Sequence, residues 1–324
     1  MIPLNDKFVI GIDLGGTNIK GALLDLNGGI IEKREIPTLA NAGPEAVAGR
    51  IAGMITELDA TVRDTGKGVA GVGIGVPGQP ERGTGEVIFA PNLYWRNVPL
   101  VKYLRRHTGL PVFLENDANV AALGEQWRGA GQGSVNMVMV TIGTGIGGGI
   151  VLDGRLYTGS NGAAGELGHA VIEPAGPQCS CGRRGCLETL TSATAMVRMA
   201  REALDRGVKT ELSKEENLEA RDIIMAARAG DRLALDIVEK AAYYLGIGLG
   251  NIINILNPDT IVIGGGVSRA GELLFEPLCR TARANCLDCA GSIVRIVPAQ
   301  LGNDAGFVGA ARLVLQDNNK KCMV

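Results

Sequence analysis

One histidine and three cysteines stand close together in this sequence, at His169, Cys179, Cys181 and Cys186. Three thiolates and one imidazole form a complete tetrahedral set for zinc, with no position left open for a substrate. Thiolates are soft ligands, which favours zinc over magnesium or calcium. Free buried cysteines are the alternative, but the dense, glycine-hinged pattern C-x-C-G-x-x-G-C favours a metal. The sequence therefore predicts a structural zinc site.

Polar residues near this set can bind a substrate rich in hydroxyl groups. Asn116 and Asp117 follow a short apolar run, and Glu166 and Glu188 lie on either side of the metal set. His169 can present one ring nitrogen to zinc and the other to a hydroxyl group. Carboxylates and amides offer several planar hydrogen-bond acceptors. On spacing alone, however, Asn116 or Asp117 is more simply the cap of a following helix.

Three glycine-rich loops each follow a short apolar run, at Gly15-Gly16-Thr17, Gly143 to Gly149, and Gly264 to Gly266. Without a Cβ, backbone N–H groups can approach phosphate oxygens closely, so such loops are candidates for phosphate binding. The pattern G-x-G-x-x-G also occurs, but no helix follows it, and no G-x-x-x-x-G-K-[ST] loop is present. Tight β-turns are the alternative, weakened by the presence of three such loops.

The residues that position these loops follow strand and helix patterns. We predict strands at 8–13, 19–26, 30–36, 68–76, 110–114, 135–142, 149–156, 260–263 and 292–297. We predict helices at 44–58, 117–128, 192–205, 219–229, 233–256 and 305–315. The segment from Asp13 to Asp25 aligns without gaps onto Thr141 to Asp153, with strand, glycine turn and strand in both. This repeat favours two related α/β halves with a ligand cleft between them.

Composition and charge exclude several classes of protein. Glycine accounts for 48 of 324 residues, yet no G-X-Y period is present, and 46% of residues are hydrophobic, so the chain is neither collagen-like nor disordered. The net charge of −2 predicts no nucleic-acid partner. We find no secretion signal and no apolar run of membrane-spanning length, so we expect no membrane partner and a cytoplasmic location. The long apolar stretch at 233–256 suggests a homodimer.

Asp13-Leu-Gly-Gly-Thr17, Thr144-Gly145 and Gly264-Gly265-Gly266 resemble the phosphate loops of the ATPase fold shared by actin, Hsp70 and sugar kinases. The segment from Val140 through Gly168 and the C-x-C-G-x-x-G-C cluster resemble the ROK family, over essentially the whole chain. The resemblance implies a two-domain, ribonuclease H-like α/β fold with a cleft between the domains. The smaller domain is expected at 1–115 plus 303–324, and the larger one, with the zinc site, at 116–302.

The resemblance also implies roles for individual residues. Asp117 is expected to be the catalytic base, because Leu114-Glu-Asn-Asp-Ala-Asn matches the family's base motif. The sugar is expected to contact Gly78, Asn116, Asp117, Glu166, His169 and Glu188. The expected ATP-binding residues are Asp13, Gly15, Gly16, Thr17, Lys20, Thr144, Gly145, Gly264, Gly265 and Gly266. Asp13 is the expected carboxylate for magnesium, through water.

The expected activity is transfer of phosphate from Mg-ATP to the 6-hydroxyl of glucose. Glucose is expected because the motifs Glu-Asn-Asp-Ala-Asn and Glu-Leu-Gly-His most resemble those of the glucokinase members. Other hexoses such as fructose or N-acetylmannosamine, and polyphosphate as donor, remain open. Some ROK proteins are repressors with a helix-turn-helix domain before the first strand, where this sequence has only about seven residues. A non-catalytic sugar-sensing protein is less expected, because Asp117 and the phosphate loops are all present.

The other four cysteines are not assigned a role. Cys279, Cys286 and Cys289 have helical spacing and are expected to be packed thiols, and Cys322 is expected in a tail.

Overall fold

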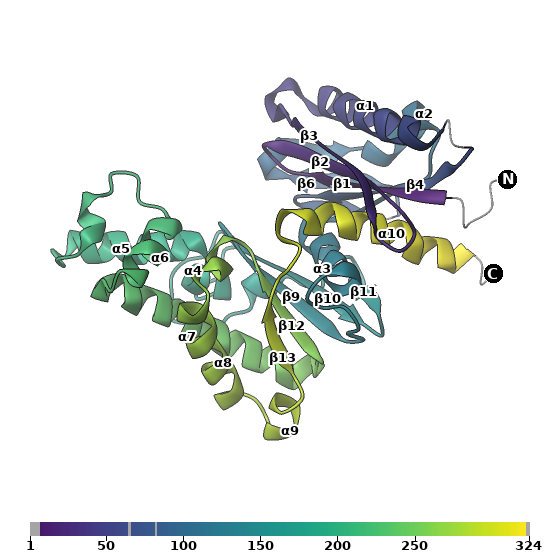
Figure 1. The fold of residues 1–324 in the computed structure, drawn as a ribbon. Coiled ribbons are helices and arrows are strands. Elements are labelled where there is room, and N and C mark those ends of the chain that lie inside the picture. Colours follow the sequence, from purple (N-terminus) through teal and green to yellow (C-terminus); the bar gives the residue numbers. More distant parts are fainter. Residues whose placement is uncertain (1–6, 64–65, 82, 322–324) are drawn as a thin grey trace. The chain divides into compact units, whose positions relative to one another are not determined.

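The computed structural model describes residues 7–63, 66–81 and 83–321. Its contacts divide the chain into two compact units, which are described separately below (Figure 1). Unit 1 comprises Met1–Gly133, Gly149–Ala164 and Gln300–Val324, and unit 2 comprises Ser134–Gly148 and Gly165–Ala299. The functional domain boundaries expected at 115/116 and 302/303 stay a prediction.

A five-stranded sheet with the order β3-β2-β1-β4-β8 lies at the centre of unit 1. Its strands are β1 (Lys7–Leu14), β2 (Asn18–Leu24), β3 (Ile30–Pro37), β4 (Gly68–Val76) and β8 (Val112–Asn116). Because β1, β4 and β8 are parallel, their carboxyl ends meet at one edge. In Figure 1, α1 (Pro44–Arg63) and α2 (Leu100–Thr108) cover one face of the sheet. The other face is covered by α10 (Ala305–Lys321), which packs against α3 (Asp117–Arg128).

Alternation along β1 decides which side chains reach which face. The even-numbered residues from Ile10 to Leu14 belong to the core beneath α1, whereas Val9 belongs to the core beneath α10. Successive side chains of a strand point to opposite faces, so Asp13 shares the α10 face with Val9. A Cβ built on Gly306, in the first turn of α10, would lie 2.5 Å from Cγ of Asp13. Asp13 therefore lies against the start of α10.

Glycine on this face lets the backbone of α10 approach the sheet. A Cβ on Gly11 of β1 would lie 1.8 Å from the carbonyl oxygen of Phe307, and one on Gly73 of β4 would lie 1.7 Å from that of Ala310. No side chain fits at either position. Part of the glycine excess thus serves helix-on-sheet packing and not phosphate binding.

A second, three-stranded sheet of unit 1 is absent from the sequence prediction. It has the order β5-β6-β7, with β5 (Gln79–Glu81), β6 (Glu86–Ala90) and β7 (Trp95–Val98). The helix α2 was also not predicted. The three strands are only three to five residues long, too short for a period of two to be recognised.

A second five-stranded sheet has the order β11-β10-β9-β12-β13. Its strands are β9 (Met137–Ile142), β10 (Ile146–Leu152), β11 (Arg155–Tyr157), β12 (Thr260–Gly264) and β13 (Arg295–Pro298). β12 pairs in parallel with β9 and with β13, so the glycines that follow β9 and β12 lie at the same edge. The predicted strand at 149–156 is wrong in its bounds, because Asp153 and Gly154 adopt positive φ and turn the chain there. The predicted pair of strand–turn–strand segments is confirmed.

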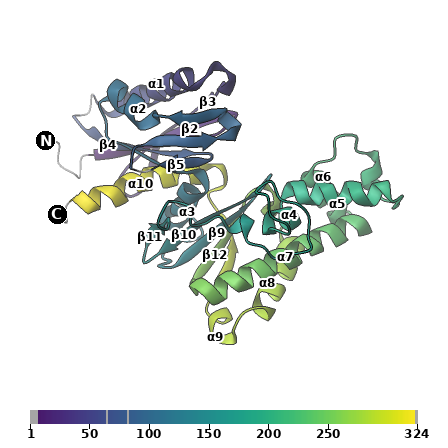
Figure 2. The ribbon, with the colours of Figure 1, turned by 180° about the vertical axis from the view of Figure 1, so that it is seen from behind.

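The helices of unit 2 pack on one another beside this sheet (Figure 2). They are α4 (Leu187–Thr191), α5 (Ala193–Asp205), α6 (Ala220–Arg228), α7 (Arg232–Leu256), α8 (Glu272–Ala284) and α9 (Asp288–Gly291). A Cβ on Gly246 of α7 would lie 2.5 Å from Cβ of Thr281 in α8. The apolar length of α7 is thus used within the chain, and a homodimer stays a prediction.

The cysteines outside the metal set differ in exposure. Cys279 and Cys286 are half-buried, but Cys289 is exposed. The expectation of a packed thiol is wrong for Cys289, because α8 ends at Ala284 and the chain turns before the short α9. Cys322 lies outside the described residues.

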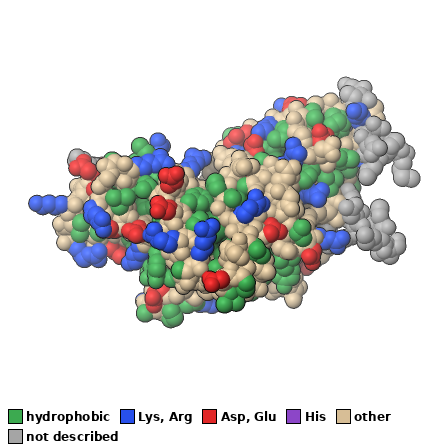
Figure 3. Space-filling model, turned by 60° about the horizontal axis from the view of Figure 1, so that its bottom comes forward, with side chains coloured by type: hydrophobic (Ala, Val, Ile, Leu, Met, Phe, Trp, Pro, Cys, Tyr) green, Lys and Arg blue, Asp and Glu red, His purple; other side chains and the backbone are tan. Residues whose placement is uncertain are grey.

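The surface shows a mixture of both charges. On the face drawn in Figure 3, Lys and Arg side chains alternate with Asp and Glu, so no region of that face carries one sign of charge alone. Among the described helices, none combines the length and apolar character that crossing a membrane requires.

Candidate functional site

In unit 1, the turn between β1 and β2 has the properties of a phosphate loop. The N–H of Gly15 donates to the carbonyl of Asn18 at 2.9 Å, which closes the turn. The buried Thr38 holds it from behind: its hydroxyl donates to the carbonyl of Gly15 at 2.6 Å and its N–H to the carbonyl of Thr17 at 2.7 Å. Gly16 and Thr17 are exposed at the tip, where an anion can approach the backbone closely.

Asp13, directly before this turn, is a perturbed carboxyl group. Its pKa is raised to about 6, chiefly by burial and also by the nearby charge of Asp117, while Lys20, its partner across the strand pair, opposes the rise. Two carboxylates at one sheet edge are stabilised by a cation, and carboxylate oxygens are ligands that Mg²⁺ prefers. Asp13, with the charge of Asp117 nearby, therefore fits a hydrated magnesium ion.

Asp13→Asn is expected to stabilise the metal-free protein at pH 8 by about 3 kcal/mol, because the pKa of Asp13 is about 6 in the folded state and ordinarily 3.8. A raised carboxyl pKa means that the folded state loses stability as pH rises from about 4 to about 6, and an amide removes that loss. At pH 4 the folded-state carboxyl is protonated and the unfolded-state carboxyl is only partly ionised, so the gain should shrink to less than about 1 kcal/mol. Urea unfolding of both proteins at pH 8 and at pH 4 measures this, and equal stability at pH 8 would contradict it.

Asn116 and Asp117 stand where β8 ends and α3 begins. The carbonyl oxygen of the Asn116 side chain accepts from the N–H groups of Ala118 at 2.9 Å and Asn119 at 3.2 Å, so Asn116 is the helix cap. Its amide group donates to the carbonyl oxygen of Gly78 at 3.0 Å. Asp117 is the first residue of α3 and accepts from the N–H of Ala118 at 2.8 Å. The cap and the acid are thus separate residues, and capping by Asn116 fixes the position of Asp117.

Gly78 is held in a conformation that favours glycine. Its φ is +103°, and a Cβ would lie 2.2 Å from the carbonyl oxygen of Phe89 in β6. The three-stranded sheet thus presses directly on Gly78, whose carbonyl oxygen accepts from Asn116. The structure brings together Gly78, Asn116 and Asp117, three of the residues predicted for sugar binding.

In unit 2, the glycine loops after β9 and β12 meet. A Cβ on Gly265, whose φ is +85°, would lie 2.3 Å from the carbonyl oxygen of Ile142 at the end of β9. The N–H of Gly143 donates to the carbonyl of Gly145 at 2.9 Å, and Thr194 of α5 donates to the carbonyl of Thr144 at 2.8 Å. The two loops therefore form one backbone-lined edge.

A cavity of about 850 Å³ opens beside these loops, entirely within unit 2. Its lining includes Gly143 and Thr144 from one loop and Gly266 from the other. Apolar and basic side chains complete it, among them Val197, Leu218, Ile224, Met225, Arg228 and Arg269. An apolar chamber with cationic groups next to a phosphate-type loop suits a nucleotide base and its phosphates.

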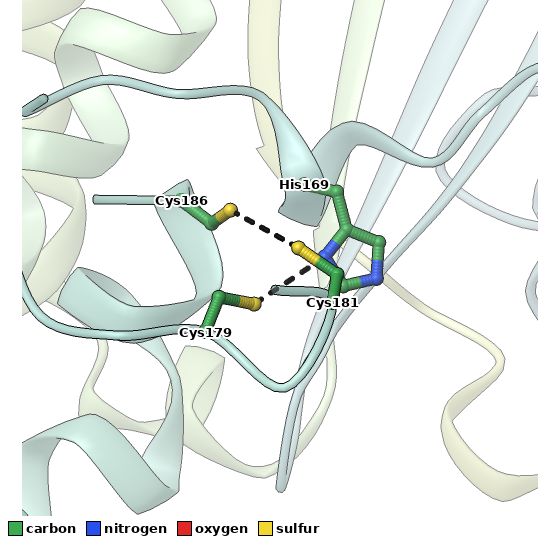
Figure 4. Close-up of side chains that lie close together, drawn as sticks. All are labelled: His169, Cys179, Cys181 and Cys186. Carbon is green, nitrogen blue, oxygen red and sulfur yellow. Dashed lines mark hydrogen bonds between the residues drawn. The ribbon is translucent and has the colours of Figure 1, made fainter. Parts of the chain in front are cut away.

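His169, Cys179, Cys181 and Cys186 converge on one point (Figure 4). Their candidate ligand atoms lie within 4.8 Å of one another, with 3.6 Å between Nδ1 of His169 and Sγ of Cys179 and 3.6 Å between Sγ of Cys181 and Sγ of Cys186. Zinc–ligand bonds of about 2.3 Å to sulfur and about 2.0 Å to nitrogen at tetrahedral angles place ligand atoms roughly 3.6–3.8 Å apart. The four residues therefore fit zinc in both chemistry and spacing.

Two acids lie close to the metal set in the structure or in the sequence. Since Nδ1 of His169 faces the cysteines, Nε2 is directed elsewhere and lies 3.9 Å from a carboxylate oxygen of Glu166. Cys186 is the cap residue of α4, and Glu188 lies in the first turn of that helix. The carboxylate of Glu188 accepts from the N–H of Ile146 at 3.0 Å, directly after Gly145. The structure thus places Glu188 beside the Thr144–Gly145 loop, which the spacing had not indicated.

Other residues of the site escaped the sequence prediction. Thr38, which holds the phosphate turn, and Gly306, which lies against Asp13, are far from both in the sequence. The cavity-lining side chains of α6 carry no motif, and only the amphipathic pattern of that helix indicates a buried face.

Comparison with known proteins gives consistent matches. A model of the ROK family matches residues 9–317. A glucokinase of Halalkalibacterium halodurans is 43% identical over 98% of this chain and 97% of its own. A putative xylose repressor of Caldicellulosiruptor sp. is 36% identical over 97% of this chain and 79% of its own. Among solved structures, a ROK family glucokinase from Streptomyces griseus in complex with glucose and AMPPNP has a TM-score of 0.76 and 36% identity, and covers 95% of this chain and 99% of its own.

Proposed function

The chain belongs to the ROK family, and on that basis we propose that it is an ATP-dependent glucokinase, which transfers the γ-phosphoryl group of Mg-ATP to the 6-hydroxyl of glucose. The two-domain actin-like α/β fold of the sugar kinases, predicted from the sequence, is confirmed. The observation that carries the proposal is the Asp117 carboxylate at the start of α3, next to the carboxyl of Asp13 and the phosphate turn.

We assign the proton transfer to Asp117. Phosphoryl transfer needs a base that takes the hydroxyl proton while the phosphates are held in line. Asp117 sits on a helix end fixed by Asn116, so its carboxylate is held in place for that task. For sugar recognition we propose Gly78, Asn116, Asp117, Glu166, His169 and Glu188.

We assign the nucleotide to the glycine loops and the cavity. The turn at Gly15, Gly16 and Thr17, with Lys20 behind it, would bind phosphate. In unit 2, Thr144, Gly145 and Gly264 to Gly266 would bind the rest of the nucleotide, with its base in the apolar cavity. Magnesium would be held through water by Asp13 and would neutralise phosphate charge when bound.

Zinc would be held by His169, Cys179, Cys181 and Cys186, a set without an open position. Its effect would be structural: it fixes the tautomer of His169, so that Nε2 can donate to a sugar hydroxyl, and it fixes the start of α4, which carries Glu188. The cytoplasmic location and the homodimer stay predictions, and light scattering of the purified protein tests the second.

A coupled assay across hexoses, with ATP and polyphosphate as alternative donors, tests the proposed function. Glucose with ATP is expected to give the highest kcat/KM. A higher value for fructose, N-acetylmannosamine or polyphosphate would reassign the substrate or donor. Sugar binding without turnover by any donor would favour a non-catalytic sugar-sensing protein. The similarity to a putative xylose repressor is the observation that supports this second candidate.

Gly266→Phe is expected to raise KM for ATP by about tenfold or more and to leave glucose binding unchanged. Gly266 lines the cavity, and a Cβ there would meet nothing within 4 Å, so a large side chain can occupy the cavity without a backbone clash. Steady-state kinetics and glucose calorimetry measure the two effects. Gly53→Phe is the control, because Gly53 is equally open but lies on the exposed side of α1. An unchanged KM for ATP would place the nucleotide elsewhere.

A further inference from the structure

Glu125 of α3 is a fully buried carboxylate, with 0% of the residue exposed, that none of the proposed roles uses. In the part of the chain that the structure describes, the hydrogen bonds to its two oxygens come from backbone N–H groups. The donors are Ala130 at 2.8 Å, Gln300 at 3.0 and 3.1 Å, and Leu301 at 2.8 Å. These donors come from two segments far apart in the sequence. One carboxylate therefore joins the end of α3 to the segment that leads into α10.

A carboxylate suits this position because all of its hydrogen-bonding partners are donors. A buried carboxylate is strongly disfavoured unless hydrogen bonds satisfy both oxygens, and here both oxygens are used. A glutamine would present one oxygen and one NH₂ group, and the NH₂ group would face backbone N–H donors. A Cβ on Gly129 would lie 2.0 Å from Oε2, so the chain after α3 also folds closely over the carboxylate.

The contact continues from Glu125 to the start of α10. Leu301, bound by Glu125, accepts from the N–H of Asp304 at 3.0 Å, and α10 begins at the next residue. Gly124, next to Glu125, packs against the same place: its Cβ would lie 2.3 Å from the carbonyl oxygen of Ala305. The first turn of α10 is thus held against α3 by two adjacent residues of α3, Gly124 and Glu125.

The same first turn lies against Asp13. A Cβ on Gly306 would lie 2.5 Å from Cγ of Asp13 and 2.6 Å from its Oδ2. The N-terminus of a helix also favours a negative charge nearby. A shift of this turn therefore changes the surroundings of the carboxylate to which we assign the magnesium of Mg-ATP.

We propose that Glu125 is a positioning residue for the nucleotide site: its carboxylate holds Gln300 and Leu301, and through them the first turn of α10, at the distance from Asp13 that lets Asp13 hold hydrated magnesium. The inference rests on the proposed function, since it takes Asp13 to serve Mg-ATP. Glu125 itself touches neither substrate.

The test is Glu125→Gln, studied by calorimetric binding of AMPPNP with and without Mg²⁺, and of glucose. For the wild type we expect Mg²⁺ to tighten AMPPNP binding. For the variant we expect that gain to fall by about tenfold, as when partners of metal ligands are removed, with glucose binding unchanged within about twofold. A purely structural role would weaken both ligands alike or neither, and either result overturns the inference.

Asp25→Asn is the matched control, because Asp25 also accepts two backbone N–H groups in unit 1, at 2.8 Å each, but in the turn between β2 and β3. It should keep the full effect of Mg²⁺. Gly306→Ala tests the same route if Glu125→Gln does not fold, because its methyl group presses on Asp13 directly. A full Mg²⁺ effect in Gly306→Ala overturns the route. A wild type that gains nothing from Mg²⁺ instead contradicts the proposed function.

Discussion

Asp117→Asn is expected to lower kcat by about 10³-fold, within the range usual for loss of a general base, and to change the dissociation constant of glucose by less than about threefold. Such a loss corresponds to about 4 kcal/mol of transition-state stabilisation. The amide keeps the size of the side chain, and Asn116 remains the cap of α3, so the helix end should stay in place. What disappears is the carboxylate that takes the proton.

The measurement combines steady-state kinetics with calorimetric glucose binding. Glu45→Gln is the control, because Glu45 is likewise an acid in the first turn of a helix, α1, but is exposed there. It should retain wild-type kcat. Turnover by Asp117→Asn within about tenfold of the wild type would remove Asp117 from the role of base.

Cys181→Ser should lose zinc and weaken glucose binding by about 10- to 100-fold. A hydroxyl is a poor zinc ligand compared with a thiolate, and three remaining ligands do not close a tetrahedron. Without the metal, the ring of His169 loses its fixed orientation, and the start of α4 with Glu188 loses its anchor at Cys186. Stability should fall as well, since the binding energy of a structural zinc ion contributes to folding.

Elemental analysis gives the zinc content, and calorimetry and thermal unfolding give the other two effects. Cys289→Ser, at an exposed cysteine outside the metal set, should keep zinc, glucose affinity and stability. Wild-type protein without zinc would refute the metal assignment. A zinc-free Cys181→Ser protein with normal glucose affinity would refute the link between metal and sugar.

Sequence patterns predicted most of the long elements and the residues that converge locally. The strand at 68–76 and the helix at 117–128 are confirmed with their bounds, because each has a long periodic pattern and a clear end signal. The metal set could be predicted because its ligands lie within one short segment.

What sequence patterns did not predict depends on contacts between distant segments. Thr38 and Gly306 belong to the site only because the sheet and α10 bring them to residues 13–17. Glu125 looks like any helical glutamate until Gln300 and Leu301 are placed beside it. The short strands of the three-stranded sheet lack enough residues to show a period, and Gly11 and Gly73 gave no sign that they face a helix.

The glycine face of the first sheet has a consequence for the biosynthesis of this protein. Strands β1 and β4 emerge early from the ribosome, but α10, whose backbone covers Gly11 and Gly73, begins only at Ala305 and is made after both strands. Gly11 and Gly73 carry no side chains that could cover this part of the face in the meantime. This face of the sheet therefore stays uncovered until α10 has been synthesised. In a stalled or truncated nascent chain the sheet would remain exposed to chaperones and proteases.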